Sequence, residues 1–188
     1  MSTDAATRLV TADELAEISS AGQRCELIRG EVVYMSPAFS THGRVAMRLG
    51  TRLSYFIEGQ GLGTTFAAET GFLIGRDPDT VRAPDAAFVS TELLERVGPA
   101  EKFFPAAPTL AVEVASPNDS AKEVDAKARM WIAAGSEQAW VALPSRKTVT
   151  IYDKSGGVRI LGENETLDGG DMLPGFELSV SEVFSGIV

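Results

Sequence analysis

The sequence is poor in the residues that build disulfides and transition-metal sites. Its 188 residues include one cysteine, Cys25, and one histidine, His42. A lone cysteine cannot form an intrachain disulfide, which excludes a disulfide-stapled secreted domain. One cysteine and one histidine also cannot make a structural zinc site or a multi-histidine metal centre. Any metal bound by this chain is therefore expected to be a hard cation held by carboxylates.

Long apolar runs and basic residues are scarce as well. No segment approaches the roughly 18 apolar residues that span a bilayer. Residues 1–10 contain Asp4 and Arg8 without an apolar core, which argues against a signal peptide. The 17 basic residues are outnumbered by 26 acidic ones, and the formal net charge is −9. This balance argues against nucleic-acid binding through a broad basic surface but leaves room for a local basic cleft. We expect a cytoplasmic protein with no membrane segment.

What the chain does contain is typical of a folded domain. Hydrophobic residues make up 44% of the sequence and charged residues 23%, which excludes wholesale disorder and fibrous repeats. With about 150 residues per domain as the usual prior, the length predicts a single domain over residues 1–188.

Apolar periodicity predicts an α/β protein. A helical stripe runs through 41–58, and a capping box formed by Ser120 and Glu123 opens a second helix that Gly135 ends. Strands are expected at 24–35 (two strands around Gly30), 64–75, 81–89, 109–115 and 137–143, with a hairpin at 147–153 and 157–162. The core order is helix, strand, strand, strand, helix, strand. It predicts a mixed central sheet flanked by helices, with added β-hairpins. Short helices at 11–19 and 91–97, a loop at 99–108 and an irregular C-terminal cap with one short strand complete the prediction.

Two carboxylates occupy strand positions where apolar residues are expected. Glu113 lies in the middle of the apolar run 109–115, and alternation puts it on the face of its small alanine neighbours. Burying a carboxylate there costs several kcal/mol unless it is paired or binds a cation. Asp85 follows Pro84 inside a predicted strand, where both residue types are unusual. The alternative interpretations are a glutamate that is exposed or paired with lysine, and a turn-forming aspartate.

The second predicted helix carries a lysine on its apolar side. Val124 precedes Lys127 by three residues and Trp131 follows it by four, so the three side chains share one face. That face is expected to pack on the sheet, where a lysine is unusual. The alternative is a buried stem that carries the ammonium group out to water.

Asp85, Glu113 and Lys127 together form a set suited to phosphodiester hydrolysis. Two carboxylates on adjacent strands, with the backbone carbonyl of Val114, can hold Mg²⁺ or Mn²⁺. Such a metal polarises a phosphodiester and lowers the pKa of its bound water. The lysine can orient the attacking water and offset the charge that builds up on the phosphate.

Short motifs along nearly the whole chain resemble one known family. They are ELIRGE at 26–31, the segment 37–42, RAPDAAFV at 82–89, LAVEVASPNDS at 110–120, Lys127 with Trp131, the run 133–144 and LPGFELSVSEVF near the C-terminal end. In this order and spacing they are similar to the Uma-two family, a group of restriction-endonuclease-like proteins of the PD-(D/E)XK nuclease superfamily. The resemblance implies a restriction-endonuclease-like core, αβββαβ, in agreement with the order predicted above.

The resemblance also assigns roles to individual residues. It makes Asp85 the acidic residue of the PD element and Glu113 that of the (D/E)XK element. The usual lysine position holds Ala115, and the family places its lysine on the following helix, where Lys127 lies. The chain departs from the family at Leu143, where aspartate is common, and at Trp131, where tyrosine is usual.

Other polar positions are secondary candidates. Glu26 and His42 match recurrent polar positions of the family, and Glu69 could supply a further carboxylate. His42 lies at the start of a predicted helix, where it could shuttle a proton or contact a phosphate. The alternative is a structural histidine.

The same helix carries Arg44, Arg48 and Arg52 at intervals of four residues. They could form a stripe that follows a phosphate backbone, or simply a solvated face.

The leading prediction is a magnesium-dependent endonuclease, an endodeoxyribonuclease of the PD-(D/E)XK type that hydrolyses DNA. The alternative is a non-catalytic protein that keeps the nuclease fold as a binding or regulatory module, which the net charge favours. A third interpretation is action on RNA. Because cutting both strands of a duplex suits two-fold symmetry, a homodimer is expected.

Overall fold

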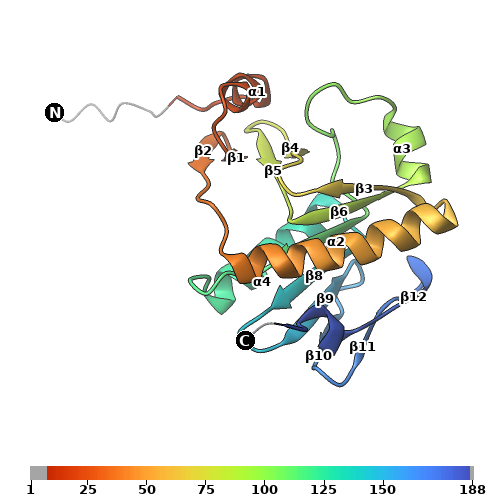
Figure 1. The fold of residues 1–188 in the computed structure, drawn as a ribbon. Coiled ribbons are helices and arrows are strands. Elements are labelled where there is room, and N and C mark those ends of the chain that lie inside the picture. Colours follow the sequence, from red (N-terminus) through yellow and green to blue (C-terminus); the bar gives the residue numbers. More distant parts are fainter. Residues whose placement is uncertain (1–7, 187–188) are drawn as a thin grey trace.

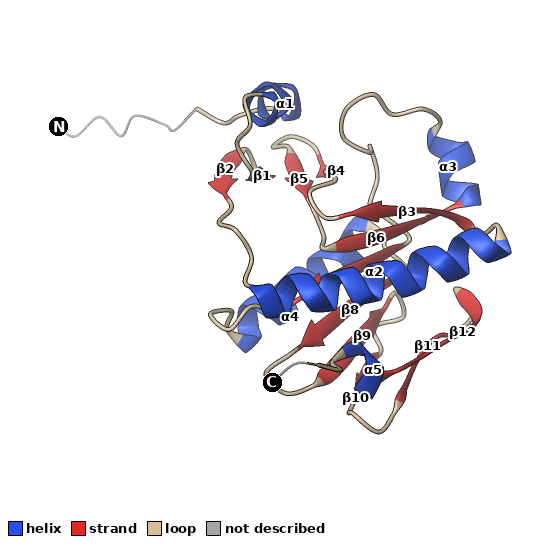
Figure 2. Cartoon of the chain, viewed as in Figure 1, coloured by secondary structure: helices blue, strands red, loops and turns tan. Residues whose placement is uncertain are grey.

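A six-stranded mixed sheet forms the centre of the molecule in a computed structural model that describes residues 8–186 (Figures 1 and 2). Residues 1–7, part of the segment in which no signal peptide is expected, lie outside this range. The β7–β8 pair is parallel and the other neighbouring pairs are antiparallel. The strand order is β10 (Val158–Leu161), β9 (Thr148–Asp153), β8 (Gln138–Leu143), β7 (Leu110–Val114), β6 (Ala86–Ser90) and β3 (Gly63–Ala67).

Two helices cover the opposite faces of this sheet. Helix α2 (Ser40–Gln60) runs across the front of the sheet in Figure 1, and α4 (Ala121–Ala134) lies behind it. Strand β7 is buried along its whole length between them. Its residues Leu110, Val112 and Val114 join the core on the α2 side, whereas Ala111 joins the core on the α4 side. Strand alternation therefore aims Glu113 at α4. The predicted αβββαβ order and the mixed, helix-flanked sheet are confirmed.

Local sequence explains where both helices begin and end. In α2, Val45, Leu49 and Leu53 of the predicted apolar stripe are buried, and Ile57 continues their four-residue spacing in place of the predicted Phe56, which is partly buried. The helix ends at Gly61, whose φ of 64° lies in the left-handed region that glycine tolerates. In α4, the predicted capping box forms between Ser120 and Glu123, and Gly135 ends the helix. The short helix α3 (Thr91–Val97) matches its prediction as well.

A second, four-stranded sheet corrects two strand predictions. Its order is β2 (Glu31–Tyr34), β1 (Cys25–Ile28), β5 (Thr80–Arg82) and β4 (Phe72–Gly75), and α1 (Ala12–Ser20) packs against β1. The predicted strand 64–75 breaks at a turn in which Glu69 has a φ of 72°. The predicted strand 81–89 breaks at Pro84, which has no N–H group to give to a ladder. Each predicted strand thus divides between the two sheets, and the segment 83–85 passes from one sheet to the other.

The C-terminal segment is more regular than predicted. In place of an irregular cap it forms a hairpin, β11 (Thr166–Gly169) with β12 (Leu173–Ser179), followed by the short helix α5 (Val180–Val183). Its apolar side chains join the core that α2 builds over the central sheet: Leu167, Leu173, Phe176, Leu178, Val180, Val183 and Phe184. No helix among the described residues is long and apolar enough to cross a membrane.

The arginine stripe of α2 holds this C-terminal segment. Arg48 Nη1 donates hydrogen bonds to the carbonyl oxygens of Glu182 and Ser185, both at 2.7 Å. Arg44 donates to the carbonyl of Gly186, and Arg52 pairs with the Glu182 carboxylate. Carbonyls at a helix C-terminus lack partners within the helix, so a guanidinium is a suitable donor. The stripe therefore has partners within the chain itself, and its contact with nucleic acid stays a prediction.

We predict that Arg48→Met destabilises the protein by about 1–3 kcal/mol, because carbonyls at the end of α5 lose a charged donor. Methionine keeps the apolar stem of the side chain. The free energy of unfolding should be measured by urea denaturation, with Arg96→Met on the exposed side of α3 as the control. Equal stability of the two variants would show that the contacts of Arg48 contribute nothing.

Candidate active site

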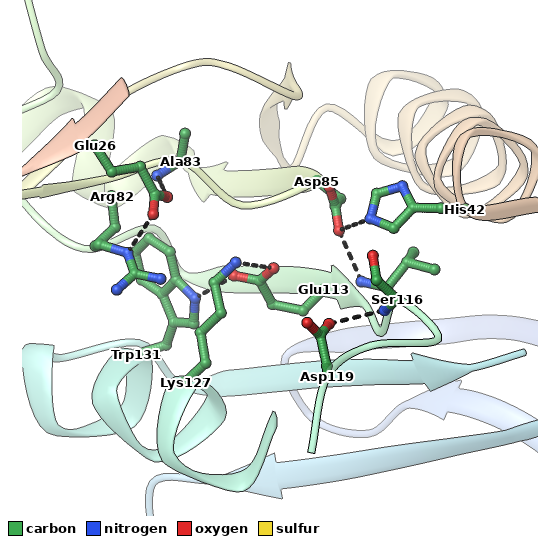
Figure 3. Close-up of polar contacts among 11 residues, drawn as sticks. Glu26, His42, Arg82, Ala83, Asp85, Glu113, Ser116, Asp119, Lys127 and Trp131 are labelled. Carbon is green, nitrogen blue, oxygen red and sulfur yellow. Dashed lines mark hydrogen bonds and ion pairs between the residues drawn. The ribbon is translucent and has the colours of Figure 1, made fainter. Parts of the chain in front are cut away.

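Asp85 is fixed at the point where the chain enters β6. Its own N–H group donates to the carbonyl of Val112 at 2.9 Å. Its carboxylate oxygen Oδ2 accepts a hydrogen bond from the N–H group of Val114 at 2.8 Å and lies 3.1 Å from His42 Nε2 (Figure 3). Both backbone bonds reach β7, so the side chain is held beside the strand that carries Glu113.

His42 is brought to Asp85 by the first turn of α2. Its Nε2 faces the carboxylate, while its Nδ1 is buried without a hydrogen-bond partner among the described residues. The hydrogen bond to Asp85 raises the pKa of His42 above its ordinary value, although burial acts in the opposite direction. His42 is thus a partner of Asp85.

Glu113 is buried in the middle of β7 and meets two donors from α4. Only 5% of the residue is exposed. Its Oε2 accepts a hydrogen bond from Lys127 Nζ at 2.7 Å, and its Oε1 accepts one from Trp131 Nε1 at 2.8 Å. Lys127 and Trp131 are four residues apart and share the face that packs on the sheet. The structure therefore turns the lysine inward onto a carboxylate, although its side chain keeps 29% exposure.

The electrostatics of this pair follow from its burial. Burial raises the pKa of Glu113, and the nearby charge of Asp85 adds to this effect, whereas Lys127 and the Trp131 hydrogen bond oppose it. Burial alone would lower the pKa of Lys127, but the charges of Glu113 and Glu26 outweigh burial and raise it. Lys127 therefore stays protonated at neutral pH, where its ammonium group neutralises Glu113.

Glu26 lies at the end of the cluster away from His42 in Figure 3. It belongs to β1 and is 4% exposed. Its Oε1 accepts a hydrogen bond from the N–H group of Ala83 at 2.9 Å, and its Oε2 lies 2.9 Å from Arg82 Nε. Glu26 thereby fixes the backbone two residues before Asp85.

Sequence reasoning missed two members of this cluster. Arg82 received no role, although a basic residue three positions before Asp85 in a strand was a usable signal. Trp131 was interpreted only as an apolar face residue, and its indole N–H group turns out to hold Glu113. The structure does not bring Glu69 to the cluster: this residue lies in the turn between β3 and β4, where its carboxylate is 59% exposed and 2.9 Å from Arg24 Nε.

The carboxylate and carbonyl oxygens around Glu113 suit a hard divalent cation as its ligands. Within residues 8–186 no group of three or more histidine, cysteine, aspartate or glutamate side chains could hold a metal ion. Mg²⁺, however, is usually held by one or two carboxylates and keeps several waters. Asp85 Oδ1 accepts no hydrogen bond from a described residue, and each Glu113 oxygen accepts one of the two bonds it can take. The N–H and C=O groups of a strand residue point the same way, so the Val114 carbonyl also faces Asp85.

We predict that the single histidine titrates above the ordinary value of about 6.5. The Asp85 charge favours imidazolium, so Asp85→Asn should lower the pKa of His42. The stability that this pair adds is then fully present below pH 6.5 and is lost as the pH rises through the folded pKa. An NMR titration of the His42 ring protons measures both values. An unchanged pKa in the variant would contradict the contact.

Lys127→Met should destabilise the protein on the order of 3 kcal/mol, because it leaves Glu113 buried without its counter-charge. The double variant with Glu113→Gln should recover much of that loss, since a neutral amide can still accept from Trp131. Urea denaturation of both variants gives the comparison. Additive effects of the two changes would mean that the two side chains act independently.

Comparisons with known proteins agree with this fold. No curated protein matches the chain. A crystal structure described as "a putative nuclease belonging to DUF820", from Anabaena variabilis, superposes with a TM-score of 0.78. It is 18% identical, and the match covers 94% of this chain and 98% of that chain. At this identity the likeness shows the fold, which is restriction-endonuclease-like.

A family model covers most of the sequence. The Uma2 model, whose description is "Putative restriction endonuclease", matches residues 12–181. These residues contain both sheets, α1 to α4 and every member of the cluster around Glu113. The chain therefore belongs to the Uma2 family, the family that its motifs resemble.

Proposed function

We propose that this chain is a metal-dependent nuclease that hydrolyses phosphodiester bonds of DNA, with Mg²⁺ or Mn²⁺ as cofactor. The observation that carries the proposal is the contact of 2.7 Å between Lys127 Nζ and the buried carboxylate of Glu113. A lysine on one element and two carboxylates on two others converge there, in a chain of a family described as restriction endonucleases. Apolar residues of similar size would stabilise a purely structural core at least as well, because a buried ion pair adds little net stability.

Asp85, Glu113 and the Val114 carbonyl are the groups that would hold the metal. A bound Mg²⁺ supplies a water of lowered pKa and polarises the phosphodiester. Lys127 keeps its proton and carries a positive charge on a side chain with 29% exposure, where it can orient the attacking water and offset charge on the phosphate. His42 holds the Asp85 carboxylate, and Trp131 holds that of Glu113, so both acids are oriented before substrate arrives.

A non-catalytic binding module is the second candidate. It is favoured by the net charge of −9 and by the arginine stripe of α2, whose guanidinium groups already bind the C-terminal segment. Such a protein would keep the cluster around Glu113 as part of its core. A nuclease with this charge must instead hold its substrate through a few cations near the site. A homodimer, as expected for cleavage of both strands, is part of the first proposal.

We predict that the wild-type protein nicks supercoiled plasmid when Mg²⁺ or Mn²⁺ is added. Asp85→Asn, Glu113→Gln and Lys127→Met should each lower the rate by about a hundredfold or more, since each removes a charge that acts on the reacting phosphate. Glu69→Gln is the matched control, because it changes an exposed carboxylate outside the cluster. Agarose gels follow the nicking, and a labelled RNA in parallel tests the other substrate.

Thermal melting separates metal binding from folding defects in the same variants. Mg²⁺ should raise the melting temperature of the wild type and of Glu69→Gln, because a ligand of the folded state stabilises it by mass action. Asp85→Asn and Glu113→Gln should lose that rise. Plasmid that stays intact with the wild type, together with no metal effect on melting, favours the non-catalytic module.

A further inference from the structure

Arg82 is a cation at the edge of the cluster that the proposed chemistry does not use. It ends β5, three residues before Asp85, and its side chain is 13% exposed. The guanidinium lies beside the buried carboxylate of Glu26, with Nε 2.9 Å from Oε2. Figure 3 draws this pair at the end of the cluster opposite His42. A structural role in joining β1 to β5 accounts for Nε alone.

The two terminal nitrogens of Arg82 have no partner in the described part of the chain. Buried side-chain atoms without a hydrogen bond there are His42 Nδ1, Arg82 Nε and Ser136 Oγ. Neither Nη1 nor Nη2 belongs to this set, and neither donates to a described residue. Both nitrogens therefore reach solvent. By contrast, Arg48 Nη1 donates hydrogen bonds to carbonyl oxygens of the C-terminal segment.

Arg82 also lies close enough to Lys127 for their charges to interact. Lys127 has its pKa raised by Glu113 and Glu26 against the effect of burial, and Arg82 acts to lower it. The two carboxylates between these cations are already engaged: Glu113 by Lys127 and Trp131, and Glu26 by Ala83 and Arg82. Each cation nevertheless keeps N–H donors that no described residue uses, namely two on Lys127 Nζ and those on Nη1 and Nη2 of Arg82, and these donors suit phosphate oxygens.

We propose that Arg82 is a substrate-binding residue that holds a phosphate group of the nucleic acid beside Lys127, through Nη1 and Nη2. A guanidinium offers two parallel N–H donors that match two phosphate oxygens. The Glu26 carboxylate forms an ion pair with this side chain, with Oε2 2.9 Å from Nε, and so keeps the guanidinium at this position. The proposal rests on the proposed nuclease function and names the cation by which an acidic chain holds its substrate.

Binding without cleavage tests this assignment. Fluorescence anisotropy of labelled single-stranded and duplex DNA, measured in EDTA over a salt series, gives the affinity and its salt dependence. Arg82→Gln should weaken binding about tenfold or more. It should also reduce the slope of log affinity against log salt by about 0.7 for the single strand or 0.9 for the duplex, the value of one phosphate contact.

Three further variants keep the test free of folding effects. The double variant Glu26→Gln with Arg82→Gln replaces the buried ion pair by neutral amides, and it should show the same loss of affinity and slope. Arg82→Lys keeps the positive charge but loses the two parallel N–H donors of the guanidinium. Its affinity for DNA should therefore fall between those of the wild type and Arg82→Gln. Arg129→Gln breaks the surface pair with Asp125 on α4 and should bind like the wild type.

Several results would overturn the assignment. Wild-type affinity and slope in Arg82→Gln would do so, as would recovery of affinity in the double variant, because either result makes the pair purely structural. Absence of DNA binding by the wild type would also overturn it. The nuclease proposal fails separately: a protein that binds DNA through Arg82 but never nicks plasmid keeps this site and loses the proposed activity.

Discussion

The cluster around Glu113 depends on one constraint: this carboxylate is buried in the middle of a strand that is covered on both faces. Strand β7 lies between α2 and α4, and only 5% of Glu113 is exposed there. Its charge is tolerable only because α4 supplies an ammonium group and an indole N–H group in place of hydration. This requirement fixes the rotation of α4 about its own axis, since Lys127 and Trp131 must both face the sheet. Asp85 is held beside the same strand by two hydrogen bonds to its backbone.

The charges around this point are arranged in pairs. His42 accompanies Asp85, Lys127 accompanies Glu113, and Arg82 accompanies Glu26. Paired charges of this kind hold each acid in one orientation while keeping the local sum close to neutral. A chain with a net charge of −9 can in this way keep a local site that does not repel a polyanion as strongly as the rest of its surface does.

Features that repeat locally along the chain could be predicted from the sequence. The four-residue stripe of α2, the capping box of α4 and the alternation in β7 gave the core order. The alternation also predicted the facing of Glu113, and the spacing of Val124, Lys127 and Trp131 predicted that of the lysine. Partners that are distant in sequence could not be predicted in this way. Glu26 accepts a hydrogen bond from Ala83, which is 57 positions away. It lies in the second sheet, two of whose strands, β4 and β5, were expected to be parts of longer strands. Arg48 finds its carbonyls more than 130 positions away, at the end of a segment whose apolar pattern did not indicate a hairpin.

The docking of the C-terminal segment on α2 has a practical consequence for handling this protein. Arg44, Arg48 and Arg52 are neighbours on one helix face, where like charges repel one another unless they are neutralised. The Glu182 carboxylate offsets part of that charge, and the carbonyl oxygens of Glu182, Ser185 and Gly186 accept hydrogen bonds from the guanidinium groups. Helix α2 also carries His42 in its first turn. The surface that binds the C-terminal segment and the imidazole that contacts Asp85 therefore belong to the same helix. An affinity tag or fusion partner is therefore better attached at the N-terminus, where it does not disturb the contact between α2 and the C-terminal segment.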